Sequence, residues 1–117
     1  MSRSQFAIKR VYEPRSRADG YRVLVDALWP RGVSKKDAGI DLWLKEIAPS
    51  AALRRWFAHE PDRWTGFRAR YFRELDGLEG CLEPLVERAR RSRVTLVYGA
   101  REDRCNNAVA LKEYLER

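Results

Sequence analysis

The chain has 117 residues, which suits one domain of about 100–150 residues and leaves no room for two. Hydrophobic residues make up 44% of it and charged residues 35%, a balance that favours a compact core and excludes extensive disorder. The formal net charge is +7, and no apolar run reaches the length of a membrane span, so we expect a basic, cytoplasmic protein without membrane contact.

Two strands are predicted first. Residues 6–12 show a rough alternation of apolar and polar side chains, which ends at Glu13-Pro14. Residues 21–28 form the second strand, and its continuously apolar centre is typical of a strand that is covered on both faces. The turn-forming sequence Trp29-Pro30-Arg31-Gly32 ends it.

Four helical segments follow, each with apolar residues at the three- and four-residue spacing of a buried helix face. The first covers residues 40–48, and Ser50 caps the second. The third begins at Pro61 and ends at Gly77, and the fourth covers residues 81–92. The predicted inner faces consist of Ile40, Trp43, Leu44, Ile47, Leu53, Trp56, Phe57, Trp64, Phe67, Tyr71 and Leu75.

Residues 94–98 form a third strand, residues 99–105 a loop, and Asn106 or Asn107 caps a last helix. The long helical crossover before this strand favours parallel pairing, whereas the short connection at 13–20 leaves the direction of the first strand open. We predict a small three-layer α/β domain over residues 1–117, with a short, mainly parallel sheet. Because ligands collect at the carboxyl ends of such strands, loops 29–37 and 99–107 should meet at the binding edge.

Asp26 is the strongest single candidate for chemistry, because an unpaired carboxylate inside an apolar strand is costly. Two interpretations are open. Asp26 pairs with a nearby arginine, for which Arg22 and Arg31 are candidates, or it has a shifted pKa suited to acid–base catalysis.

Several side chains near the two strand ends could bind a ligand. Arginine grips phosphate and carboxylate groups bidentately, so an arginine at this edge suits an anionic ligand. The start of the last helix adds free backbone N–H groups, which attract anions. The predicted ligand-binding residues are Arg22, Trp29, Arg31, Tyr98, Arg101, Asn106 and Asn107. Purely structural roles are the alternatives for these residues: a packed tryptophan, solvated arginines and asparagines that only cap a helix.

Cys105 is the second candidate for catalysis. It precedes the last helix and is flanked by Arg104, a setting that lowers the pKa of a thiol and favours a nucleophile. Inert packing is the alternative. The two cysteines match no disulfide framework. Together with His59, the only histidine, they are too few and too scattered to form a metal site. Neither a GxGxxG nor a Walker A motif is present, so no cofactor is assigned.

Arginines are concentrated on the third and fourth predicted helices. They are Arg63, Arg68, Arg70, Arg73, Arg88, Arg90, Arg91 and Arg93. Such a surface could bind the phosphate backbone of a nucleic acid, although a solvated helix face gives the same pattern.

The motifs Lys9-Arg10-Val11-Tyr12 and Leu28-Trp29-Pro30-Arg31-Gly32, with the Asn106-Asn107-Ala108 run, resemble those of the YeaO-like family of bacterial domains of unknown function. The resemblance covers essentially the whole chain and implies a small Rossmann-like α/β domain without an established activity. Ala27 and Cys105 depart from it, because relatives often have Arg and His at these positions. Any catalytic role of this loop in relatives is therefore altered here.

Three functions are compatible with these observations. The first is a small enzyme or sensor that binds an anionic ligand, such as a nucleotide or phosphate ester, at the carboxyl edge of the sheet, with Asp26 as its acid–base or orienting group. The second is a nucleic-acid-binding module that uses the arginine-rich helices. The third is a protein-interaction factor without catalysis, which an exposed apolar patch would favour.

Overall fold

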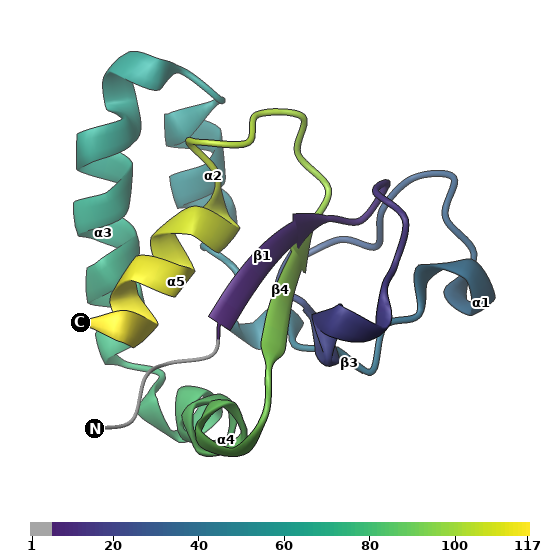
Figure 1. The fold of residues 1–117 in the computed structure, drawn as a ribbon. Coiled ribbons are helices and arrows are strands. Elements are labelled where there is room, and N and C mark those ends of the chain that lie inside the picture. Colours follow the sequence, from purple (N-terminus) through teal and green to yellow (C-terminus); the bar gives the residue numbers. More distant parts are fainter. Residues whose placement is uncertain (1–5) are drawn as a thin grey trace.

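A computed structural model describes residues 6–117 and contains a four-stranded, all-parallel sheet with α-helices around it (Figure 1). The strands are β1 (Phe6–Arg10), β2 (Tyr21–Leu24), β3 (Leu42–Trp43) and β4 (Val94–Tyr98), in the order β1-β4-β2-β3. The predicted α/β class and parallel sheet are confirmed. The direction of the first strand is now defined, because β1 pairs in parallel with β4 from Phe6 opposite Val94 to Arg10 opposite Tyr98.

β4 is the centre of the sheet, and all five of its residues are buried. Its side chains alternate between the two faces, as those of any strand do. Val94, Leu96 and Tyr98 enter the larger core, whereas Val97 enters a smaller core on the opposite face. Both faces of the strand are therefore covered, which explains its continuously apolar sequence.

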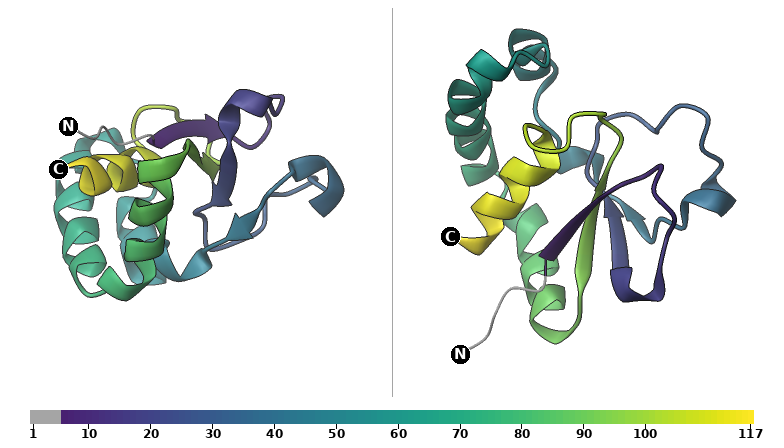
Figure 2. Two further views of the ribbon diagram at one scale, coloured as in Figure 1. Left: turned by 60° about the horizontal axis from the view of Figure 1, so that its bottom comes forward. Right: turned by 45° about the horizontal axis from the view of Figure 1, so that its top comes forward.

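The α-helices cover the two faces unequally (Figure 2). Four of them pack over the larger core: α2 (Ala51–Phe57), α3 (Trp64–Asp76), α4 (Glu79–Arg91) and α5 (Asn107–Glu116). The other face carries α1 (Lys35–Ala38), a single turn that the sequence did not predict. No helix in residues 6–117 combines the length and the apolar character needed to cross a membrane.

The smaller core is held by two tryptophans instead of a long helix. The rings of Trp29 and Trp43 meet edge to face with centroids 5.5 Å apart. Each indole N–H donates to a backbone carbonyl, that of Val33 for Trp29 and that of Asp26 for Trp43. Aromatic side chains and loop backbone thus supply the third layer of the predicted three-layer domain.

The predicted helix at residues 40–48 is wrong. The segment forms β3, which pairs with β2, followed by a 3₁₀ turn at Lys45–Ile47. Ile40 and Trp43 pack against the smaller core, whereas Leu44 and Ile47 belong to the larger one. The apolar residues of this segment have helical spacing because the chain crosses the edge of the sheet and contributes side chains to both cores.

Both predicted N-terminal strands end earlier than expected, at Arg10 and Leu24. The Val25 N–H still donates to the carbonyl of Val97 at 3.1 Å, but residues 26–28 leave the sheet. The fourth predicted helix begins at Glu79, two residues before the expected start. The early exit of the chain after β2 leaves residues 26–28 free to line a cavity.

Candidate functional site

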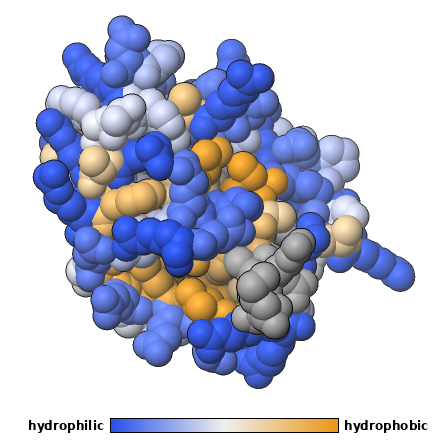
Figure 3. Space-filling view, turned by 60° about the vertical axis from the view of Figure 1, so that its left-hand side comes forward, coloured by the Kyte–Doolittle hydropathy of each residue, from blue (hydrophilic) through white to orange (hydrophobic). Residues whose placement is uncertain are grey.

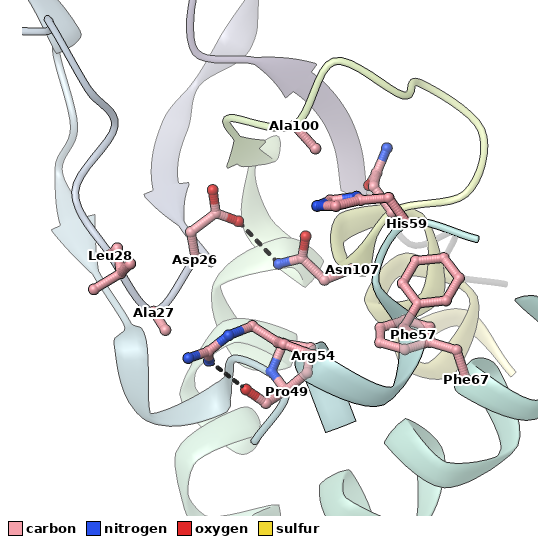
Figure 4. A pocket seen from close by; sticks show the side chains of 11 residues that line it. Asp26, Ala27, Leu28, Pro49, Arg54, Phe57, His59, Phe67, Ala100 and Asn107 are labelled. Atoms are coloured by element: carbon pink, nitrogen blue, oxygen red, sulfur yellow. Dashed lines mark hydrogen bonds between the residues drawn. The ribbon is translucent and has the colours of Figure 1, made fainter. Parts of the chain in front are cut away.

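A cavity of about 260 Å³ lies at the carboxyl edge of β2 and β4 (Figure 4). Its lining comes from the chain after β2, from α2 and the segments on either side of it, from α3, and from the loop between β4 and α5. The lining residues are Asp26, Ala27, Leu28, Pro49, Arg54, Phe57, His59, Phe67, Ala100, Asn106 and Asn107. The 99–107 loop thus reaches the edge as expected, but none of residues 29–37 lines this cavity.

Asp26 is held at the cavity by two hydrogen bonds. Its Oδ2 accepts from the Gly99 N–H at 2.8 Å, and its Oδ1 accepts from Asn107 Nδ2 at 3.0 Å. Burial raises the pKa of the Asp26 carboxyl, although these two hydrogen bonds and the charge of Arg54 act in the opposite direction. The expected partners, Arg22 and Arg31, make no such contact; an amide and a backbone N–H hold the carboxylate.

Asn107 connects the start of α5 to the end of β2. Its Nδ2 donates to the Val25 carbonyl and to Asp26 Oδ1, both at 3.0 Å. Asn106 is the N-cap of α5: its Oδ1 accepts from the Val109 N–H, and its Nδ2 donates to the Glu102 carbonyl. Both asparagines line the cavity, but Asn106 is occupied by capping, whereas Asn107 bonds to the neighbouring strand end.

Arg54 is the cationic side chain of the cavity that sequence reasoning missed. It belongs to α2, and its Nη1 donates to the carbonyl of Pro49 at 2.7 Å. Figure 4 shows its guanidinium group on the same side of the cavity as Ala27. Leu53-Arg54 belongs to the residues that resemble the YeaO-like family, but the place of Arg54 at the cavity was not predicted, because that place depends on where α2 crosses the sheet edge.

The segment after α2 has unusual backbone geometry. Ala58 and His59 both lie in the left-handed region, with φ values of 48° and 57°, which residues other than glycine rarely adopt. This bend ends the helix and places His59 at the cavity. From the sequence, His59 was considered as a metal ligand, for which too few partners are present. Nearby, Phe57 and Phe67 stack with centroids 4.5 Å apart and form an apolar wall.

Arg22, predicted as a ligand-binding residue, is buried on the other face of the sheet. Its Nη1 lies 2.6 Å from Asp19 Oδ2, and its other donors bond to the carbonyls of Ala38 and Gly39. Lys9 Nζ lies 2.8 Å from the second oxygen of Asp19. Burial raises the pKa of Asp19, but hydrogen bonds from Lys9, Ser16 and Arg22 outweigh it, so the net pKa is lowered. Arg22 therefore stabilises the fold and is remote from the cavity.

The other predicted ligand-binding residues do not line the cavity. Trp29 packs in the smaller core. Arg31 is exposed, and its carbonyl accepts a hydrogen bond from the Tyr12 hydroxyl at 2.8 Å. Tyr98 is buried in the larger core, which raises the pKa of its hydroxyl, and Arg101 is exposed on the loop. Of the seven residues predicted to bind ligand, the structure brings Asn106 and Asn107 to the cavity.

Cys105 is half-buried against the larger core and does not line the cavity. Burial and the charge of Glu102 raise the pKa of its thiol, and the opposing effect of Arg104 is smaller. This direction contradicts the lowered pKa that the flanking arginine and the helix start predicted. A raised pKa reduces the thiolate fraction at neutral pH, so the geometry gives no support to a nucleophilic role.

Within residues 6–117, no three His, Cys, Asp or Glu side chains are grouped so as to hold a metal ion. A second, more open cavity of about 310 Å³ lies between α4 and α5. Its lining is Glu79, Leu82, Glu83, Val86, Tyr114 and Leu115. On this side of the molecule, apolar residues reach the surface among hydrophilic ones (Figure 3). Nothing in this lining pairs a cation with fixed hydrogen-bonding groups, as the first cavity does.

The fold and the first cavity define a parallel α/β protein with a candidate small-molecule site at the carboxyl edge of its sheet. A family model described as "Inactive DUF488-N3 subclade" matches residues 5–117, and the chain belongs to this family. It is 43% identical over 107 residues to the uncharacterized protein YeaO of Escherichia coli (strain K12), covering 92% of this chain and 93% of that protein.

A second relative is an uncharacterized protein of Mycobacterium tuberculosis (strain ATCC 25618 / H37Rv). It is 40% identical over 108 residues, which cover 92% of this chain and 91% of that protein. No solved structure matches the chain. The predicted membership of the YeaO-like family is confirmed by the sequence comparisons.

Proposed function

We propose that the protein binds a small ligand with a phosphate or carboxylate group in the cavity at the carboxyl edge of the sheet. The observation that carries this proposal is the position of Arg54. One of its guanidinium nitrogens is used by Pro49, and its remaining donors can grip an anion.

The rest of the lining supports a small organic molecule over a bare inorganic anion. Phe57 and Phe67 give the cavity an apolar wall, and Leu28, three-quarters exposed, extends the apolar surface outward. Cavities that combine apolar walls with a few fixed polar groups are typical of small-molecule sites. A ligand with an apolar body and one anionic group matches this lining.

We favour a binding or sensing role over catalysis. The family description contains the word "inactive", and the raised thiol pKa of Cys105 argues against a nucleophile. Asp26 is anchored by Gly99 and Asn107, an arrangement that suits a group which orients a ligand. The proposal therefore assigns Asp26 to ligand positioning and requires no chemical step.

The proposal is tested by comparing Arg54→Ala with Arg55→Ala. Arg55 neighbours Arg54 on α2 but does not line the cavity, so it is a matched control for the loss of one charge. A thermal-shift screen with nucleoside 5′-monophosphates, sugar phosphates and benzoate identifies a ligand, and titration calorimetry gives its Kd. Losing a charge-assisted hydrogen bond should weaken binding roughly 10- to 100-fold in Arg54→Ala and leave Arg55→Ala unchanged. Equal affinities in the two variants would exclude Arg54 as the anion partner.

Nucleic-acid binding by the arginine-rich helices stays a prediction with less support. Arg70 and Arg63 lie over the ring of Trp56, with centroid distances of 3.9 Å and 5.5 Å, and Arg68 pairs with Glu113 at 2.6 Å. These arginines already have partners within the protein. A short oligonucleotide in the same screen tests this function, since phosphate-backbone binding weakens steeply as salt is raised.

A further inference from the structure

The floor of the cavity presents hydrogen-bond acceptors. The orientation of the Asn107 amide is fixed, because the Val25 carbonyl can only accept a hydrogen bond and therefore requires the nitrogen. Both N–H groups of Asn107 are used, one by Val25 and one by Asp26. Its Oδ1 receives no hydrogen bond from residues 6–117. Because this oxygen is also not a buried atom, a ligand can reach it. Figure 4 shows this oxygen directed away from the Asp26 contact.

Asp26 adds further acceptor capacity beside this oxygen. Each carboxylate oxygen accepts one hydrogen bond within the protein, from Gly99 or from Asn107. A carboxylate has about four acceptor positions, so about two remain. The free oxygen of Asn107 and the carboxylate of Asp26 thus form a pair of acceptors at the junction of β2 and α5.

Arg54 has the opposite character, because its guanidinium group offers only hydrogen-bond donors and a positive charge. The cavity is therefore dipolar, with acceptors and a carboxylate at one place and a guanidinium at another. A ligand that is anionic throughout would be repelled by Asp26 when that group is ionised. A ligand with N–H donors at one end and an anion at the other complements both groups, and the aromatic wall formed by Phe57 and Phe67 suits a flat ligand body.

We propose, resting on the function proposed above, that the ligand is a flat, dipolar molecule: an N–H donor edge meets Asp26 and Asn107, and an anionic group meets Arg54. Amidines, primary amides and amino-substituted heterocycles supply such an edge. This names the chemical class of the ligand, which an anion site alone does not.

Three small probes test the two ends separately. 4-Amidinobenzoate carries both the donor edge and the anion, 4-acetylbenzoate lacks the N–H donors, and benzamidine lacks the anion. Titration calorimetry at neutral pH should show 4-amidinobenzoate binding at least about 10-fold more tightly than either other probe, as each end contributes a charge-assisted contact. In ¹⁵N-labelled protein, the side-chain amide resonance of Asn107 should shift with 4-amidinobenzoate and with benzamidine. In Arg54→Ala the advantage over benzamidine should disappear, and in Arg55→Ala it should remain.

The outcomes separate this inference from the proposed function. Equal binding of 4-amidinobenzoate and 4-acetylbenzoate, both weakened in Arg54→Ala, would overturn the donor edge and leave the anion site standing. Equal binding of 4-amidinobenzoate and benzamidine would overturn the anion site and the dipolar ligand with it. Absence of binding by all three probes at millimolar concentration, or an unshifted Asn107 resonance, also overturns the inference.

Discussion

Asn107 Nδ2 donates to Asp26 Oδ1 at 3.0 Å, although the two residues are 81 positions apart in the chain. The same nitrogen donates to the Val25 carbonyl, so one amide fixes the end of β2 against the start of α5. Asp26 and Asn107, which form the floor of the cavity, thus also connect β2 to α5.

The first prediction concerns the contact between Asp26 and Asn107. Asp26→Ala and Asn107→Ala should each destabilise the fold by about 1–3 kcal/mol, because each leaves a partly buried polar partner without its hydrogen bond. In the double variant the effects should be less than additive, with a coupling energy of about 0.5–3 kcal/mol. Urea denaturation of the four proteins measures it. Strict additivity would show that the contact contributes nothing to stability.

The second prediction contrasts two arginines near β2. Arg22→Ala should cost about 3–5 kcal/mol, because it removes a partner of the buried Asp19 carboxylate and frees one buried and one partly buried carbonyl. Arg31→Ala should change stability by less than about 0.5 kcal/mol, since Arg31 is exposed and contributes its backbone carbonyl to the Tyr12 contact. Urea midpoints of the two variants check both values. A mild effect at Arg22 would contradict the structural role.

The third prediction follows from the lowered pKa of Asp19. A carboxyl group whose pKa falls on folding stabilises the folded state above its ordinary value of 3.8, and this stabilisation is lost as the pH falls through the lowered pKa. Asp19→Asn should therefore be less stable at neutral pH and lose less stability on acidification below pH 3.8. The exposed Asp62, changed to Asn, is the control and should leave the pH profile unchanged.

The fourth prediction compares two glycines. Gly20 has φ +65°, and a Cβ there would collide with the backbone carbonyl oxygen of Arg93, so Gly20→Ala should destabilise by more than about 1 kcal/mol. Gly80 lies in α4, and no atom lies within 4 Å of the place that a Cβ would take there, so Gly80→Ala should stabilise by up to about 1 kcal/mol. Thermal unfolding of the two variants should move Tm in opposite directions.

The fifth prediction concerns the pH dependence of donor binding. Protonation of Asp26 removes the charge that an amidine meets, so benzamidine affinity should fall as the pH is lowered toward the raised pKa of this carboxyl. The polar side chains that share the cavity with Asp26 are Arg54, His59, Asn106 and Asn107, and the Gly99 N–H bonds to its carboxylate. A pH-independent Kd would place benzamidine away from Asp26.

Much of the fold could be predicted because its signals are local. The strand at residues 94–98 was predicted with the bounds observed, since a short apolar run between turn signals has few alternatives. The helix predicted at residues 40–48 failed because Ile40 and Ile47 enter cores on opposite faces of the sheet. Periodicity shows that side chains are buried, but it does not show on which side of the sheet.

The site was predicted in part. Asp26 and Asn107 were identified because a carboxylate in an apolar strand and an asparagine at a helix start are unusual in local sequence. Arg54 and His59 were not, because they reach the cavity through the crossing of α2 and through a left-handed bend at Ala58. Arg22 was placed at the site by its nearness in sequence, but strand alternation directs it to the opposite face.

The strand order has a consequence for how the chain assembles. β1 and β2 are the first strands made, yet neither pairs with the other; both pair with β4, which begins at Val94. During synthesis, β1 and β2 therefore cannot pair with β4 until most of the chain has been made. Until then their unpaired backbone N–H and C=O groups and their apolar side chains are open to other chains, the situation in which newly made proteins aggregate or engage chaperones.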